Sequence, residues 1–303
     1  MAANVQVERM SDKLPARKSR TARTTVGHWL LHGLLLLLGL LYMVPLLWVL
    51  STSFKAENKV FTFPIQWIPN PFIWQNYQQL LTLLEFSGIP AILFFFQNTL
   101  IVAIFSTVGT VLSSVLVAYS FSRLQWPERN FFFGMSLATM MLPGVVIIIP
   151  TFLLFRDLGW LDTLKPLIVP FWFAVQGFYV FLLRQFFLTL PVELEEAARI
   201  DGAGSFRILW QIIIPLSGPA LITVTIFSFL QHYNEFLGPL LYLNTVEKFP
   251  MALGLRMFQG RYGTNWPILM AATAVFIVPT IFVFLAAQRH FIRGIHLTGL
   301  AGR

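Results

Sequence analysis

The sequence predicts an all-α protein that crosses a membrane several times. Of its 303 residues, 56% are hydrophobic and 16% aromatic, whereas only 11% are charged, which is far too apolar for a water-soluble domain of this length. A helix needs about 20 apolar residues to cross a bilayer, and six stretches of the chain qualify. These stretches are residues 28–51, 94–122, 131–155, 165–187, 217–242 and 267–288. Six spans place both termini on the same side of the membrane.

Residues 1–27 form a polar, basic tail without apolar periodicity, and we assign no chemistry to them. The first apolar stretch follows this tail and could be mistaken for a secretory signal. It is longer than the apolar core of a signal, contains Pro45 and lacks a small-residue cleavage site, so we interpret it as a retained helix. We expect residues 28–303 to form one transmembrane domain, because no span repeats another.

The distribution of basic residues predicts the orientation. With the N-terminus in the cytoplasm, 14 of the 21 lysines and arginines lie on the cytoplasmic side and 7 on the opposite side. Both termini and the segment 189–215 are therefore expected in the cytoplasm. In a soluble protein, a formal net charge of +8 would suggest binding to nucleic acid. In this chain the positions of the basic residues indicate the orientation in the membrane, and no nucleic acid is expected as a partner. The chain has no cysteine, which excludes disulfides and thiolate metal sites.

Prolines and aromatic residues mark the loops and bends. The outer segment from about 52 to 93 is rich in both, which predicts turns and an aromatic belt at the membrane interface. The loop 123–129 is short enough to make the second and third spans neighbours. Pro143 and Pro150 are each expected to kink the third span. Kinked helices usually line a pathway, and a kink that only improves packing is an equal alternative for either proline.

Residues 189–215 are predicted to form a water-exposed helix, a glycine break and a second helix. Thr189 is placed to cap the first helix, and Pro191 suits its first turn because proline lacks the N–H that is unpaired there. Three acidic residues lie near the positive end of the helix dipole: Glu193, Glu195 and Glu196. We expect a small apolar face flanked by these glutamates, formed by Leu190, Leu194, Ala197 and Ala198, with Asp201 one turn later on the same side.

Gly202 is predicted to end this helix, since glycine adopts a left-handed backbone without the penalty of a Cβ. Ser205 is then placed to cap a second helix that runs toward Pro215. The pattern resembles the signature of bacterial ATP-binding-cassette (ABC) importer permeases: Glu196-Ala197-Ala198, three residues, Gly202, nine residues, Ile212, one residue and Ile214-Pro215. Ile214 replaces the usual leucine. An ordinary amphipathic loop helix is the alternative, but it does not explain so many fixed spacings.

No catalytic or metal-binding motif accompanies the spans. The chain has no phosphate-binding loop of the Walker A type and no His-Glu-x-x-His pattern, and its five histidines are scattered. ATP hydrolysis must therefore come from another chain, and no cofactor or metal is expected in this one. His232 lies in the fifth span, where a lone histidine is more often a packed side chain than a ligand.

The most unusual polar cluster is Gln231-His232-Tyr233-Asn234-Glu235 in the fifth span. An ionisable residue in a span is costly unless it faces protein or water, so Glu235 is a candidate for the solute pathway, together with Tyr233 and Asn234. A carboxylate that reaches the outer interface is the alternative, because Glu235 lies toward the outer end of the span. Residues 233–240 resemble the W-N-E-F-x-x-P-L signature of carbohydrate-type permeases, with Tyr233 in place of tryptophan. Residues 69–77, 258–267 and 288–294 resemble segments of the same family.

The resemblance runs from residue 28 to residue 303 and is strongest to the oligosaccharide class, which includes the smaller permease of the maltose system. It implies a six-helix subunit that moves a sugar or oligosaccharide into the cytoplasm. The implied partners are a homologous second permease, two ATPase subunits that bind ATP and Mg²⁺, and an external solute-binding protein. The implied ATPase-coupling residues are Glu196, Ala197, Ala198, Gly202, Ile212 and Pro215.

Two other classes of protein would need features that the sequence lacks. A proton- or sodium-coupled transporter would be expected to have carboxylates near the membrane midplane and two related halves, and this chain offers only Glu235. An intramembrane enzyme would need convergent His, Ser or Asp side chains in the spans. The substrate stays open, because relatives with these motifs carry sugars, sugar alcohols or glycerol phosphate derivatives.

Overall fold

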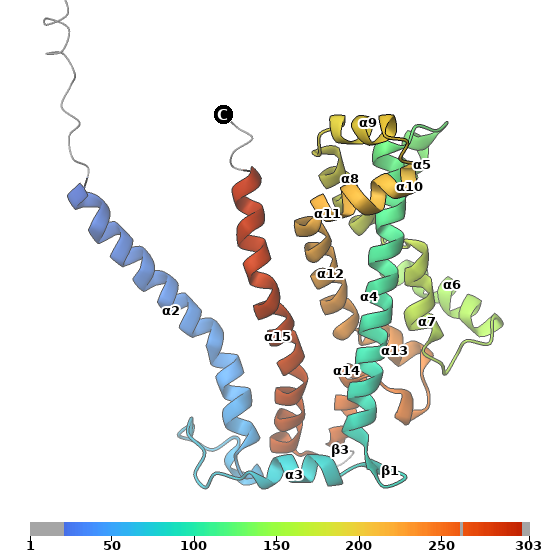
Figure 1. Ribbon diagram of the computed structural model, residues 1–303. Coiled ribbons are helices and arrows are strands. Elements are labelled where there is room, and N and C mark those ends of the chain that lie inside the picture. The colour runs from blue at the N-terminus through green and yellow to red at the C-terminus, as the bar shows by residue number, and fades with distance from the viewer. Residues whose placement is uncertain (1–20, 261–262, 299–303) are drawn as a thin grey trace, which may run out of the picture. The chain divides into compact units, whose positions relative to one another are not determined.

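The computed structural model describes residues 21–260 and 263–298, which are mostly helical (Figure 1). The chain divides into two units between Trp48 and Val49. Helix α2 (Thr21–Ser53) makes up the described part of the first unit and continues into the second. It begins inside the predicted tail and contains Pro45. Residues 1–20 of that tail lie outside the described residues.

Four helices among the described residues are long and apolar enough to cross a membrane, and they correspond to the first, second, fourth and sixth predicted spans. They are His28–Ser53 within α2, Ala91–Arg123 (α4), Lys165–Leu188 and Trp266–Ala286 within α15 (Trp266–Thr298). The stretch Lys165–Leu188 consists of α7 (Lys165–Ile168), the 3-10 helix η3 (Val169–Phe173) and α8 (Gly177–Leu188).

The third predicted span is broken into two helices. α5 (Arg129–Thr139) and α6 (Gly144–Asp157) meet at an angle of 99°. Pro143 is the N-cap of α6. Because proline lacks an N–H and disfavours a helical backbone at the residue before it, α5 cannot continue through this position. The bend expected at Pro143 is therefore a full break, whereas Pro150 lies inside α6.

The fifth predicted span differs more from a straight helix. The helix that precedes it is an arm of α10 (Ser205–Ile208), the π-helix η4 (Leu209–Ile213) and α11 (Ile214–Leu216), which was predicted as part of the segment 189–215. This arm meets α12 (Gly218–Tyr233), the first helix of the predicted span, at 82°. α12 ends at Tyr233, and the short helix α13 (Leu237–Tyr242) follows. Pro239 accounts for this second break, since its ring would collide with the carbonyl of Glu235 in a continuous helix. Six spans result if each bent pair is one span.

The shorter elements lie in the connections. The helical ones are η2 (Glu57–Lys59), α3 (Gln75–Thr82), α9 (Glu193–Ile200), η5 (Val246–Lys248), α14 (Met251–Gly254) and η6 (Leu255–Phe258). The strands are β1 (Glu85–Phe86), β2 (Ile89–Pro90), β3 (Gln259–Gly260) and β4 (Gly263–Thr264), which form two antiparallel hairpins, β1 with β2 and β3 with β4. In the outer segment the ring of Phe54 stacks on Phe72 and Trp74, with centroid distances of 4.2 and 5.8 Å.

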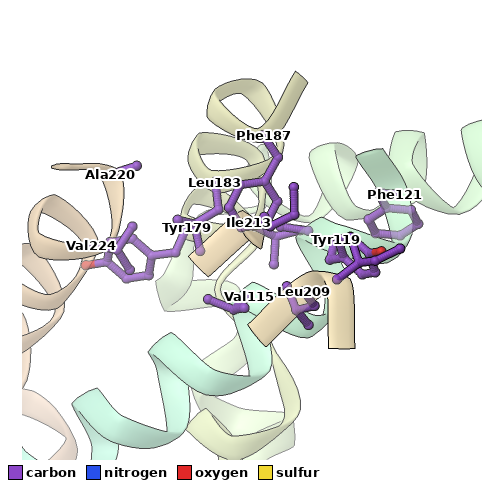
Figure 2. Packing of buried hydrophobic residues seen from close by; sticks show 13 residues of the cluster. Val115, Tyr119, Phe121, Tyr179, Leu183, Phe187, Leu209, Ile213, Ala220 and Val224 are labelled. Atoms are coloured by element: carbon purple, nitrogen blue, oxygen red, sulfur yellow. The ribbon is translucent and has the colours of Figure 1, made fainter. Parts of the chain in front are cut away.

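The two larger clusters of buried apolar side chains hold the second unit together. One joins α4, α8 and α12 to the arm 205–213, and includes Tyr119, Phe187 and Leu209 (Figure 2). The other joins α3, α14 and α15 to the beginning of α4, around Phe95 and Met251. In Figure 1, α9 and α10 lie at one end of α4, whereas α3 and β1 lie at its other end. The predicted cytoplasmic and outer segments therefore lie at opposite ends of the same helix.

Asp162 ties together the loops that follow α6 and α13. Its Oδ1 accepts the backbone N–H groups of Asn244 (3.0 Å) and Thr245 (2.8 Å), and its Oδ2 accepts the Thr245 hydroxyl (2.5 Å) and the Lys248 ammonium (2.8 Å). Lys248 and the other hydrogen bonds hold the pKa of Asp162 well below its usual range. The C-terminal ends of α6 and α13 are thereby held together.

Candidate functional site

The segment after α8 forms a tight elbow of two helices, α9 and the arm that begins with α10. α9 ends at Ile200, and Gly202 has a left-handed backbone with a φ of +79°. The N–H of Gly202 donates to the carbonyl of Arg199 (3.0 Å), and the N–H of Ala203 donates to the carbonyl of Ala198 (2.9 Å). These bonds satisfy two carbonyls at the end of the helix. The predicted glycine break is confirmed, and the second helix continues through Pro215 as predicted.

Both predicted helix caps are wrong. Thr189 is the C-cap of α8, and its hydroxyl donates to the carbonyl of Phe186 at 2.7 Å. It cannot also cap α9, which begins at Glu193 after Val192. Ser205 is itself the first residue of α10, with Gly204 as the N-cap, and no side-chain cap bond is present there. The predicted cap lies three residues before the true one in the first case and one residue after it in the second, because the turn between two packed helices depends on how far the first helix extends.

The predicted coupling residues lie on both sides of the elbow. The exposed ones are Glu196, Ala197, Gly202 and Pro215. Ala198 and Ile212 are half-buried and pack against the cluster shared by α4 and α8. Both also line a hollow of about 170 Å³ between the two helices, together with Asp201, Ala203, Arg207, Ile208 and Gln211. The structure therefore brings Ala198 and Ile212 together and leaves Glu196 and Ala197 open to another chain.

The prediction that the glutamates of α9 flank its apolar face is wrong for Glu195. Its side chain points inward and is 5% exposed, and its Oε1 lies 3.0 Å from Nε of Arg123 at the end of α4. Glu193 and Glu196 are exposed, as expected. Burial raises the pKa of Glu195, and the positive charges of Arg123 and Arg199 oppose that rise. Helical periodicity could not reveal this pair, because its partner belongs to a distant part of the chain.

A second candidate site is a groove of about 720 Å³ along the two bent spans. Its wall is mostly apolar and is built from α4, α6, α7, η3 and α13, with His232 from α12. The polar lining residues are Thr151, Gln176, His232, Glu235 and Tyr242. Glu235 is the only carboxylate among them, and the lining contains no lysine or arginine. The ring of His232 lies edge-on to Phe171 at 4.2 Å, so this histidine is packed, as predicted.

Of the three predicted pathway residues, the groove includes Glu235. Its Oε1 accepts the N–H of Gly238 at 2.9 Å, at the start of α13. Tyr233 is fully buried, its ring stacks on Phe276 of α15 at 4.7 Å, and its hydroxyl donates to the Phe276 carbonyl at 2.8 Å. Asn234 is exposed, and its amide donates to the Leu230 carbonyl of its own helix (2.8 Å). Tyr233 therefore packs α12 against α15, while Glu235 faces the groove.

The structure shows no candidate metal centre in the part of the chain that it describes. Within residues 21–260 and 263–298, no group of three or more His, Cys, Asp or Glu side chains could hold a metal ion. The two features that stand out are the elbow and the groove, which are built from different helices.

Comparisons with known proteins agree with this architecture. Residues 109–297 match the family model described as binding-protein-dependent transport system inner membrane component. The chain is 35% identical to the sn-glycerol-3-phosphate transport system permease protein UgpE of Yersinia enterocolitica, over 87% of this chain and 94% of the relative. It is 33% identical to the sulfoquinovosyl glycerol transport system permease protein SmoH of Agrobacterium fabrum, over 85% and 88%.

A solved structure of a bacterial ABC transporter involved in the import of the acidic polysaccharide alginate has the same fold. It superimposes with a TM-score of 0.77 and 24% identity, and the match covers 89% of this chain and 98% of that chain. The family match spans more than half of the chain and includes the elbow and all the residues that line the groove except Val102. The chain therefore belongs to the family of binding-protein-dependent transport system inner membrane components.

Proposed function

We propose that this chain is one of two permease subunits of an ATP-driven importer, and that separate ATPase subunits dock on the elbow. The observation that carries this proposal is the way the elbow is built. Its solvent-exposed side presents Glu196, Ala197 and Gly202. Its buried side packs through Ile208 and Leu209 into the cluster that joins α4, α8 and α12. Because packed helices move as rigid bodies, a force on the exposed side reaches the spans.

The family's description supports an external solute-binding protein as a further partner, acting at the end of the spans opposite the elbow. The excess of basic residues in the predicted cytoplasmic segments supports an orientation with the elbow and both termini in the cytoplasm of a bacterial inner membrane. A reporter fused at Arg303 that is active only outside the cell would contradict this orientation.

The solute that we propose is a sugar or oligosaccharide. Such a solute is rich in hydroxyl groups, which can exchange hydrogen bonds with Thr151, Gln176 and Glu235 in the groove. A glycerol phosphate derivative is the second candidate, favoured by the 35% identity to a relative named for sn-glycerol-3-phosphate transport. The two candidates are separated by finding which of them raises the melting temperature of the cognate binding protein.

The purified chain alone is expected neither to bind nor to hydrolyse ATP, because it lacks a phosphate-binding loop. Hydrolysis should appear when the ATPase subunits are added, and it should increase with the solute-loaded binding protein. The measurement is phosphate release in proteoliposomes that contain the chain alone, the two permeases, or the full complex. ATPase activity of the chain by itself would overturn the proposal that separate subunits hydrolyse ATP.

Replacing Glu235 by glutamine is expected to reduce uptake at limiting solute roughly tenfold, which corresponds to about 1.4 kcal/mol. Glutamine keeps the side-chain oxygen that accepts the Gly238 N–H, so the complex should still assemble and only the charge in the groove is lost. Glu247→Gln is the matched control, because Glu247 is an exposed carboxylate outside the groove. Asn234→Ala should add little to Glu235→Gln. Wild-type uptake by the Glu235 variant would favour the alternative, in which the Glu235 carboxylate reaches the membrane interface and has no role in the pathway.

A further inference from the structure

We propose that Arg123 is a positioning residue for coupling, and that its pairing with Glu195 makes α9 move as one body with the ends of α4 and α8. This inference rests on the proposed docking of ATPase subunits on the elbow. It assigns a role to two charged residues that lie inside the permease and would not touch the ATPase.

The guanidinium of Arg123 lies where three parts of the chain meet. Arg123 is the last residue of α4. Its Nη2 donates to the carbonyl of Phe187 in the last turn of α8, and to the carbonyl of Leu190 (2.7 Å) in the turn that leads to α9. Its Nε lies 3.0 Å from Oε1 of Glu195 in the first turn of α9. One side chain thus connects the end of α4 to the end of α8 and to α9.

The chemistry of arginine suits this position. A guanidinium is planar and always charged, and it presents several N–H donors in fixed directions, so it can satisfy a carboxylate and two carbonyls at once. The carbonyls at the end of α8 also carry the negative end of that helix's dipole, which favours a cation there. A lysine at the same position would supply the charge without the fixed set of donor directions.

The ion pair of Arg123 and Glu195 also compensates for the weak apolar packing of α9. Of the residues of α9, Ala198 alone is among those that pack against the buried cluster, and Leu194 is exposed. Small side chains hold a helix in place only weakly, because they bury little surface. The side chains of Arg123 and Glu195 are each 5% exposed, so the loss of either would leave the other as a buried charge without its partner. The ion pair therefore adds a buried electrostatic attachment of α9 to the end of α4.

The test uses the full complex in proteoliposomes with its binding protein. Glu195→Ala is expected to lower the solute transported per ATP hydrolysed roughly tenfold, within the usual range of coupling energies. Glu193→Ala is the matched control, because Glu193 lies in the same helical turn and is exposed. Wild-type transport per ATP in an assembled Glu195→Ala complex would overturn the proposal.

The position of α9 can be measured directly, because the chain has no native cysteine. Spin labels on cysteines introduced at Ile200, at the exposed end of α9, and at Leu116, on the exposed side of α4, report the distance between the two helices. A single narrow distance distribution is expected in the otherwise unchanged chain and with Glu193→Ala, and a broadened one is expected with Glu195→Ala. An unchanged distribution would contradict the positioning role.

Two further variants separate positioning from mere stability. Arg123→Lys keeps the charge and should restore part of the coupling that Arg123→Leu loses. Arg123→Leu combined with Glu195→Leu removes both charges and leaves none unpaired, so this chain should fold even if single variants do not. It is expected to remain uncoupled, with a broadened distance distribution. Normal coupling of this double variant would overturn the proposal, whereas normal coupling of Gly202→Asp would overturn the proposed docking itself.

Discussion

Replacing Gly202 by aspartate is expected to abolish solute uptake without changing the affinity of the binding protein for its solute. Gly202 has a φ of +79°, where a Cβ costs about 1 kcal/mol or more. A Cβ built there would meet no heavy atom of this chain within 4 Å, so the new side chain would project into the space that we propose for the docked ATPase. Binding-protein-stimulated ATPase activity should therefore be lost together with uptake.

Gly204→Asp is the matched control for this experiment. Gly204 is two residues away, is also exposed and has equally open surroundings, but its φ is −73°, which any residue can adopt. It adds the same charge to the elbow without backbone strain, and most of the uptake should remain. Uptake and ATPase activity are measured in proteoliposomes after the assembly of the complex has been checked. A Gly202→Asp complex that assembled and coupled hydrolysis to transport normally would show that this segment is not the coupling element.

Replacing Gly254 by alanine is expected to destabilise the packing of α14 against α4 by about 1–3 kcal/mol. The new Cβ would lie 2.4 Å from Cδ2 and 2.6 Å from Cγ of Phe95, far inside van der Waals contact. The ring of Phe95 is fully buried, so it cannot turn aside into solvent. α14 would have to move away from α4, which would stretch the bond from the Met251 N–H to the Thr99 hydroxyl (2.7 Å).

The thermal unfolding of the detergent-solubilised chain measures this effect. Gly134→Ala is the matched control, because a Cβ at that position of α5 meets no atom within 4 Å and alanine favours a helix over glycine by about 1 kcal/mol. Phe95→Leu should relieve part of the defect in the Gly254→Ala chain. Equal melting temperatures of the two alanine variants would refute the predicted collision. Transport per assembled complex should remain normal, unlike that of Gly202→Asp.

The features that could be predicted from sequence are those decided by neighbouring residues. The apolar stretches identify the spans because a bilayer requires about 20 apolar residues in a row. Gly202 identifies the elbow because a left-handed helix end strongly favours glycine. The bend at Pro143 was predictable for the same kind of reason, since proline lacks the N–H that the helix needs.

Other features depend on how far one helix extends and on what lies beside it. Thr189 had the right chemistry for a helix cap, but α8 runs as far as Leu188, so this threonine ends one helix instead of starting the next. Glu235 was predicted to line the pathway because it is ionisable, and Tyr233 and Asn234 were predicted together with it. Only the approach of Phe276 from α15 assigns Tyr233 to packing, and only the break before α13 places Glu235 in the groove.

The glutamates of α9 depend on both the local sequence and the tertiary structure. The sequence by itself determined that a short acidic helix with small residues precedes a glycine turn, because these are properties of successive residues along one helix. Which glutamate is buried was decided by the tertiary structure, because the end of α4 brings Arg123 to within 3.0 Å of Glu195 and leaves Glu196 in solvent. A carboxylate can be buried only where an opposite charge compensates for the loss of water, and that charge came from a distant segment of the chain.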